Sequence, residues 1–137
     1  MTKLIQDLWI VEDSGIVLFH RVFDEIIDAN LFGGMMSALN SFAEELTKSG
    51  LSNFEVSDKQ FSLLKDGNYL FIANTSKKQN LKKLNKELEL IKNKFYENFQ
   101  AEILNNWNGD TTLFNSFMQQ IEESLEGFIQ KLEESFW

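Results

Sequence analysis

Residues 4–23 read LIQDLWIVEDSGIVLFHRVF, and they constrain the rest of the chain more than any other segment. Two runs rich in β-branched and large apolar residues flank the turn-forming residues 12–15, which predicts a β-hairpin. Residues 8–11 and 16–19 are apolar at consecutive positions, so both faces of these strands should be buried. A sheet that is buried on both faces needs helices on both faces, and the remaining sequence has to supply them.

A helix is predicted next, over residues 31–48, because apolar residues recur at the three- and four-residue steps of an amphipathic helix. Asp28 or Asn30 should cap its start, and Gly50 should end it. The glycine pair 33–34 lies in the first turn, where we expect the helix backbone to approach the sheet closely. The stripe predicted to face the sheet is Phe32, Met35, Met36, Leu39, Phe42, Ala43 and Leu46, with Asn40, Ser41, Glu44, Glu45 and Lys48 outside.

Three short strands should follow, at residues 51–56, 60–64 and 69–74, separated by turn-forming residues. The Asp66-Gly67 pair is typical of a hairpin turn. Residues 69–73 are apolar throughout and predict a central strand. Residues 51–56 form the most polar of the strands and are therefore the best candidate for a sheet edge.

Two helices complete the pattern, because the apolar period changes from two to 3.6 after residue 76. Residues 105–110 interrupt them, with Gly109 in a C-terminal role and Asp110 or Thr111 available as the next cap. The first stripe consists of Leu81, Leu84, Leu88, Ile91, Phe95 and Phe99, and the second of Phe114, Phe117, Ile121, Leu125, Phe128, Leu132 and Phe136. The predicted order is β-β-α-β-β-β-α-α, in a single domain that spans residues 1–137.

The composition argues against several classes of protein. A formal net charge of −8 makes nucleic-acid binding a poor hypothesis, because that affinity depends on a basic surface. The chain has no cysteine, which excludes disulfides, thiolate catalysis and the common structural zinc sites. No apolar run approaches the roughly 20 residues that span a bilayer. The first residues lack the layout of a signal peptide, so the cytoplasm is the expected location.

Candidate catalytic residues are scarce. The one histidine, His20, lies among apolar residues on a predicted strand, where we expect an edge or interface side chain and not a general base. The glycine pair 33–34 is followed by two methionines, whereas a phosphate-binding loop would continue with Lys and Ser or Thr. No acidic cluster has the spacing of a calcium loop. We therefore expect no enzyme, no cofactor and no metal site.

Three features remain as candidate binding surfaces. A lysine cluster stands at the start of the helix after residue 76, in a segment, residues 77–101, with seven lysines and three glutamates. It is either a solvated helix face or a contact for acidic lipid headgroups or an acidic partner, through Lys78, Lys82, Lys83 and Lys86. Phe54 and Val56 lie on the predicted edge strand, where a partner can add a strand. The amphipathic tail, residues 128–137, packs either on its own domain or on a partner.

The order of elements resembles the longin domain, and particular segments are similar to it as well. Residues 8–23 resemble the opening longin hairpin, and residues 32–42, FGGMMSALNSF, resemble the first helix of stand-alone, archaeal-type longin proteins. Residues 69–73, YLFIA, are similar to the fifth strand, and residues 107–110, WNGD, to the junction before the last helix. The related roadblock domain begins with a helix before its first hairpin, whereas here the hairpin comes first.

The resemblance implies an α+β fold in which a five-stranded antiparallel sheet has one helix on one face and two on the other. It implies a non-catalytic scaffold in membrane-trafficking-type machinery, which binds or regulates a Ras-like small GTPase or pairs with another longin or roadblock domain, as in a homodimer. The chain departs from the SNARE type, because no coiled coil or membrane anchor follows the predicted fold, so we expect no fusion activity.

The resemblance also implies where a partner binds. In dimers of this family the first helix and the third strand commonly make the contact, which corresponds here to Asn40, Ser41, Glu44, Lys48, Phe54 and Val56. The alternative function is that of a peripheral membrane-surface adaptor, which binds anionic lipid through the lysine-rich helix.

Overall fold

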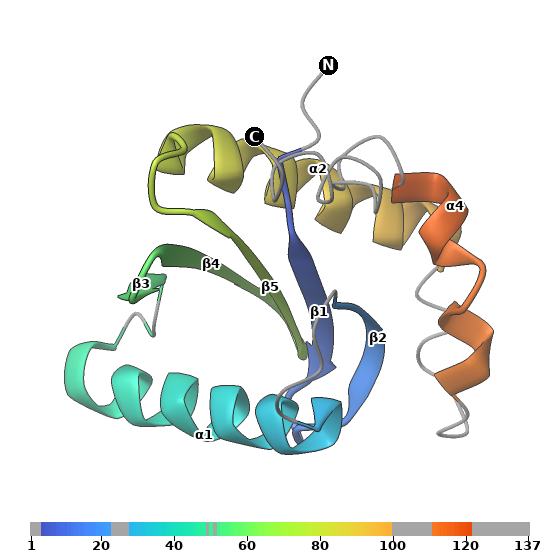
Figure 1. Ribbon diagram of the computed structural model, residues 1–137. Helices are drawn as coiled ribbons and strands as arrows, with labels where there is room; N and C mark the ends of the chain where they lie inside the picture. The colour runs from blue at the N-terminus through green and yellow to red at the C-terminus, as the bar shows by residue number, and fades with distance from the viewer. Residues whose placement is uncertain (1–3, 23–27, 49, 51, 100–110, 122–137) are drawn as a thin grey trace.

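The chain folds into three layers, with a β-sheet between two helical layers (Figure 1). The structure is a computed structural model that describes residues 4–22, 28–48, 50, 52–99 and 111–121. Helix α1 (Ala29–Thr47) covers one face of the sheet, and α2 (Leu81–Asn98) covers the opposite face. The 3-10 helix η1 (Thr111–Phe114) and the short helix α4 (Phe117–Ile121) lie on the same side as α2. This arrangement confirms the predicted α+β fold: α1 covers one face of the sheet, and α2, with η1 and α4 beside it, covers the other.

The sheet contains five antiparallel strands in the order β2-β1-β5-β4-β3. The strands are β1 (Asp7–Glu12), β2 (Val17–Arg21), β3 (Asn53–Val56), β4 (Lys59–Asp66) and β5 (Tyr69–Ser76). β5 is central and β3 lies at an edge, as the sequence predicts. The two-residue loop between β4 and β5 contains Gly67 at φ 60°, the left-handed conformation that the predicted hairpin turn requires.

β1, β5 and residues 17–19 of β2 are buried on both faces, as predicted, whereas Ile16, which was also expected to be buried, precedes β2 and is 44% exposed. Alternate residues along each strand contribute to two separate hydrophobic clusters, one beneath each helical layer. The cluster under α2 includes Leu8, Ile10, Phe71 and Ala73, and the cluster under α1 includes Trp9, Val11, Leu70 and Ile72. The prediction that helices must cover both faces of this sheet is therefore correct.

Helix α2 buries most of the predicted stripe: Leu84, Leu88, Ile91 and Phe95 are buried, Phe99 is buried at the C-cap, and Leu81 is half-buried. Its start is capped by Asn80, whose side chain accepts hydrogen bonds from the backbone amides of Lys82 and Lys83 at 2.8 and 3.3 Å. Phe95 lies 5.8 Å from Phe114 and 5.7 Å from Phe117, measured between ring centroids. These contacts attach η1 and α4 to α2. Leu125, Phe128, Leu132 and Phe136 of the predicted last helix lie outside the described residues.

Helix α1 begins at Asp28, one of the two predicted caps, whose Oδ1 accepts from the amides of Asn30 and Leu31 at 2.9 and 3.3 Å. Its end was predicted at Gly50, but Lys48 already adopts the left-handed conformation, at φ 69°, and ends the helix. Gly50 follows at φ 79°, where a Cβ atom would lie 2.9 Å from Asn40 Oδ1.

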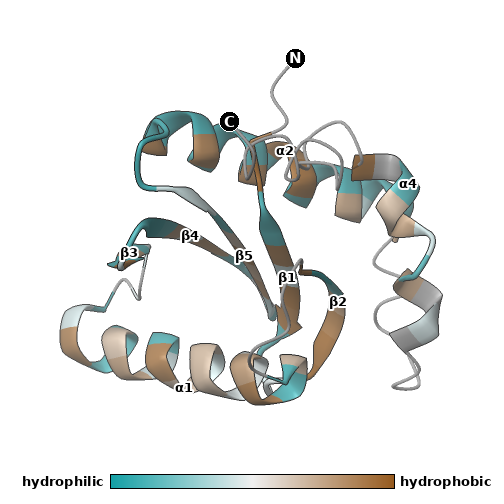
Figure 2. Ribbon diagram, viewed as in Figure 1, coloured by the Kyte–Doolittle hydropathy of each residue, from teal (hydrophilic) through white to brown (hydrophobic). Residues whose placement is uncertain are grey.

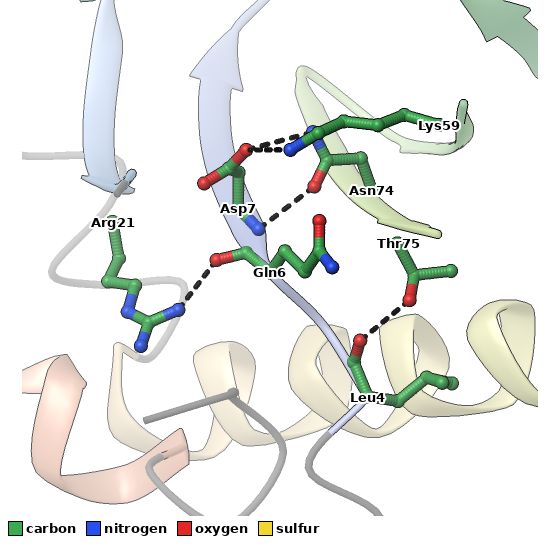
Figure 3. A network of polar contacts seen from close by, with 7 residues as sticks. All are labelled: Leu4, Gln6, Asp7, Arg21, Lys59, Asn74 and Thr75. Atoms are coloured by element: carbon green, nitrogen blue, oxygen red, sulfur yellow. Dashed lines mark hydrogen bonds and ion pairs between the residues drawn. The ribbon is translucent and has the colours of Figure 1, made fainter. Parts of the chain in front are cut away.

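A buried polar network holds the start of β1 in register (Figure 3). Asp7 and Asn74 are directly opposite in the β1–β5 ladder. The amide of Asp7 donates to Asn74 Oδ1 at 3.0 Å, and Asn74 Nδ2 donates to Asp7 Oδ2 at 3.0 Å. Lys59 Nζ lies 3.5 Å from the same carboxylate oxygen, so the buried charge of Asp7 is balanced. Arg21 and Thr75 also donate to the main-chain oxygens of Gln6 and Leu4, at 2.6 and 2.8 Å.

Candidate protein-binding site

Five large apolar side chains of α1 point away from the sheet. They are 41–69% exposed and will be called the α1 apolar stripe: Leu31, Met35, Leu39, Phe42 and Leu46. Figure 2 shows α1 as hydrophobic along much of its length, in contrast with the hydrophilic start of α2. Contiguous exposed apolar side chains are uncommon on monomeric proteins and mark interaction sites. The α1 apolar stripe is therefore the leading candidate for a binding surface.

The side of α1 that faces the sheet is less apolar than the side that faces outward. Its buried residues are Gly33, Met36 and Asn40. Phe32, half-buried, stacks on Trp9 with ring centroids 4.1 Å apart. Phe32 and Met36 therefore supply the apolar contact of α1 with its own sheet, and the larger apolar surface of the helix lies on the outward side.

This orientation corrects the predicted stripe. Met35, Leu39, Phe42 and Leu46 were predicted to face the sheet and are exposed instead. The physical reason is the close approach at Gly33, where a Cβ atom would lie 2.6 Å from Val17 Cγ2 and 2.7 Å from the Gly15 oxygen. That contact fixes the rotation of the helix about its axis. Met36 and Asn40, three and seven positions after Gly33, therefore face the sheet. The predicted close approach is confirmed: Gly33 has no room for a Cβ atom, and the Gly34 Cα lies 3.2 Å from the position that a Cβ on Gly15 would take. A Cβ on Gly34 itself would meet no atom within 4 Å.

The spacing of the α1 apolar stripe suits a second helix. Met35, Leu39, Phe42 and Leu46 follow one another at steps of four, three and four residues, the spacing at which helices pack side by side. Ala38 is exposed on the same side of the helix and is small. A partner helix can therefore approach α1 closely there.

Polar contacts fix the rest of α1 to the sheet. Lys65 Nζ on β4 lies 3.1 Å from Glu44 Oε1 and 3.5 Å from Asp13 Oδ1. The hydrogen bond to Glu44, helped by the charges of Glu44 and Asp13, raises the pKa of Lys65 above its ordinary value. Ser37 Oγ donates to the main-chain oxygen of Asp13 at 2.6 Å. These bonds hold the helix with its apolar stripe outward.

The edge strand β3 follows α1 after residues 48–52 and lies near the C-terminal end of that helix (Figure 1). It is the last strand in the sheet order, so its outer backbone groups are not paired within the described sheet. Phe54 is half-buried and stacks on Phe61, with ring centroids 4.6 Å apart, whereas Val56 is 54% exposed. β3 therefore extends the candidate site from a helix face to a strand edge.

The predicted interface residues take different positions in the structure. Ser41, Lys48 and Val56 are exposed, and Glu44 and Phe54 are half-buried. Asn40 was predicted to be on the outer side and is only 4% exposed, because it lies seven residues after Gly33 and faces the sheet. Its Nδ2 donates to Glu44 Oε1 at 2.9 Å. The apolar residues of the outer face were not among the predicted interface residues. The glycine pair 33–34 gave only a partial signal, because the sequence does not show which of the two glycines faces the sheet.

The predicted lysine cluster lies on the other side of the sheet. Lys78, Lys82, Lys83 and Lys86 are all exposed, on the outer side of α2 and the turn before it. Lys77 forms an ion pair with Glu55 at 3.3 Å. His20 is exposed on the edge strand β2, opposite Trp9 in the ladder, as predicted for an edge side chain.

Within the residues that the structure describes, no three acidic or histidine side chains are grouped so that they could hold a metal ion. Within the same residues, no helix is long and apolar enough to cross a membrane.

Comparison with known proteins identifies the fold. No protein-family model and no curated protein matches the sequence. The structure is similar to the gliding protein MglB of Thermus thermophilus, at 10% identity and a TM-score of 0.53, over 61% of this chain and 70% of that one. It is also similar to a roadblock/LC7 domain from Streptomyces avermitilis, at 13% identity and a TM-score of 0.53, over 64% and 78% of the two chains. The chain therefore has the longin/roadblock-like fold, as the order of its elements predicts.

Proposed function

We propose that the protein is a non-catalytic interaction platform that pairs, through the α1 apolar stripe and β3, with a second domain of the same fold. We propose further that this platform binds or regulates a Ras-like small GTPase in membrane-trafficking-type machinery in the cytoplasm. The α1 apolar stripe is the single observation that carries the proposal. The part of the proposal that concerns a GTPase and membrane traffic rests on the resemblance to longin domains.

The energy available from the stripe supports pairing. Each of its five side chains is about half exposed, and burying the exposed part of one contributes on the order of 1 kcal/mol. Together they offset a large part of the translational and rotational cost of association. Strand addition at the β3 edge would supply main-chain hydrogen bonds as well.

Charge supports a partner of the same kind. The exposed charged residues that the structure describes on α1 and its two caps are Asp28, Glu45 and Lys48, and none of them belongs to the α1 apolar stripe. A second α1 therefore meets no like-charge repulsion along the stripe when the two helices run antiparallel. An uncharged, apolar helix face of this type matches another copy of itself.

The GTPase part of the proposal is tested by titration. Ras-like small GTPases, loaded with GDP or with a non-hydrolysable GTP analogue, are titrated into the protein at concentrations above and below those at which it pairs. We expect binding in at least one nucleotide state. Absence of binding in both states, to monomer and to dimer, would contradict a role with small GTPases and leave pairing to be judged by its own measurement.

A further inference from the structure

A second surface lies on the face of the molecule opposite α1. Lys78, Lys82, Lys83 and Lys86 project from the first turns of α2 and from the residues before it, and will be called the basic face. Lys82 and Lys86 are followed by Leu90 at the next four-residue step, so the three side chains line one side of the helix. Leu90 is 48% exposed. The basic face therefore ends in an exposed apolar side chain.

Over residues 78–90 the basic face brings four lysines together with two glutamates, Glu87 and Glu89. In the part of the chain that the structure describes, none of its four lysines forms an ion pair, whereas neighbouring Glu55 is paired with Lys77 at 3.3 Å and Glu89 with Lys92 at 3.1 Å. Cations at the start of a helix are also disfavoured by the helix dipole. Lys82 and Lys83 lie in the first turn and reduce the stability of α2 unless an anion offsets them. The protein as a whole has a net charge of −8.

The chemistry of the basic face matches a lipid surface better than a nucleic acid or a specific phosphate site. The face contains no arginine, so it lacks the two-pronged donor that recognises a single phosphate or carboxylate. It contains no aromatic side chain on which a base could stack. Clustered lysines are attracted to the anionic lipids of a membrane surface, and an exposed leucine beside them can enter the headgroup region.

From this combination we infer that the basic face and Leu90 bind the anionic surface of a membrane, as a peripheral contact. α2 and α1 cover opposite faces of the sheet, so membrane contact through α2 leaves the α1 apolar stripe accessible (Figure 1). The contact is independent of the pairing proposed above, because it uses different residues on a different face.

The test is co-sedimentation of the full chain with vesicles of phosphatidylcholine alone or of phosphatidylcholine mixed with phosphatidylserine. We expect binding only to the mixed vesicles, with an affinity that falls as salt is raised. Lys82→Gln/Lys86→Gln should weaken binding by about fivefold for each lysine removed. Leu90→Ser should also weaken binding, and by a larger factor at high salt than at low salt. Equal binding to both kinds of vesicle, or to neither, would overturn the inference.

A matched variant separates the basic face from net charge. Asn30→Asp/Asn68→Asp makes the same change in net charge as the double lysine variant, at exposed positions outside α2, the α1 apolar stripe and β3. We expect it to bind the mixed vesicles nearly as well as the natural protein. If it lost as much affinity as Lys82→Gln/Lys86→Gln, the total charge would explain the binding and the assignment to α2 would be wrong. Circular dichroism of every variant confirms that each is folded.

Discussion

At Gly33 the backbone of α1 comes so close to the β1–β2 turn that no side chain can be accommodated without movement. The nearest atoms to a Cβ there belong to Val17 and to the main chain of Gly15, and the main chain cannot give way as a flexible side chain can. Gly34 is the next residue in the same helix, and its Cβ position has no atom within 4 Å. Substitution of Gly33 therefore tests a packing constraint, whereas substitution of Gly34 tests helix propensity alone.

Alanine substitutions at these two positions should have opposite effects. Gly33→Ala should lower the free energy of unfolding by about 1–3 kcal/mol, because the added methyl group overpacks the contact with the turn. Gly34→Ala should raise it, by up to about 1 kcal/mol, because alanine is the better helix former. Urea unfolding of both variants measures the difference, and an equal change in the same direction would contradict the close approach.

The paired side chains of Asp7 and Asn74 give a second prediction for a single residue. Asn74→Ala removes two hydrogen bonds from a buried aspartate and should lower the free energy of unfolding by about 1–3 kcal/mol. Asn93→Ala, at an exposed position of α2, is the control and should stay within about 0.5 kcal/mol of the natural protein. A similar small change for both variants would show that the network contributes nothing to stability.

Among the elements, α2 and the strands could be predicted from the sequence, and the orientation of α1 could not. The stripe of α2 is unambiguous because lysines and other polar residues occupy its remaining positions. β3 could be recognised as an edge because it is polar, and β5 as central because it is apolar throughout. α1 carries apolar residues on both sides, so its periodicity alone did not determine which side faces the sheet. The Gly33 contact determines it, and that contact exists only once the turn at Gly15 is in place.

The packing of α2 against the β4–β5 hairpin gives a prediction about pH. Burial, with a contribution from Asp66, raises the pKa of Tyr96 from 10.0 to about 12, and burial with Glu12 raises the pKa of Tyr69. The unfolded chain ionises first, so it binds fewer protons than the folded chain between about pH 10 and 12. This contribution to stability is present below pH 10 and is lost as the pH rises through that window.

The ionisation of Tyr69 and Tyr96 can be measured directly from the absorbance of tyrosinate, since the chain contains only these two tyrosines. We expect both to ionise above pH 10 in the folded protein, one of them near pH 12, and Tyr96→Phe to remove the higher transition. Ionisation of both tyrosines at their ordinary pKa of about 10 would show that neither ring is packed as the structure places it.

For the molecule as a whole, the sheet separates two surfaces of different chemistry. The α1 side carries the α1 apolar stripe and the exposed edge of β3, and the α2 side carries the basic face. The fold is shared with MglB and with a roadblock domain at identities of 10% and 13%, so it is the surface residues of this chain that must specify its partners. The basic face and the β3 edge could be found from the sequence, because charge clusters and polar strands are visible there. Which side of α1 faces outward cannot be read from the sequence in the same way, so the α1 apolar stripe could be identified only in the structure.

The central claim is that the α1 apolar stripe pairs with a second domain of the same fold. The most direct measurement is the solution mass, by sedimentation over a range of concentrations, of the natural protein and of two variants. Phe42→Asp places a charge in the stripe, and Leu90→Asp makes the same kind of change at an exposed apolar position on α2. We predict a dimer for the natural protein and for Leu90→Asp, and a monomer for Phe42→Asp. A natural protein that stays monomeric at all concentrations, or a dimer that Phe42→Asp leaves intact, would contradict the claim.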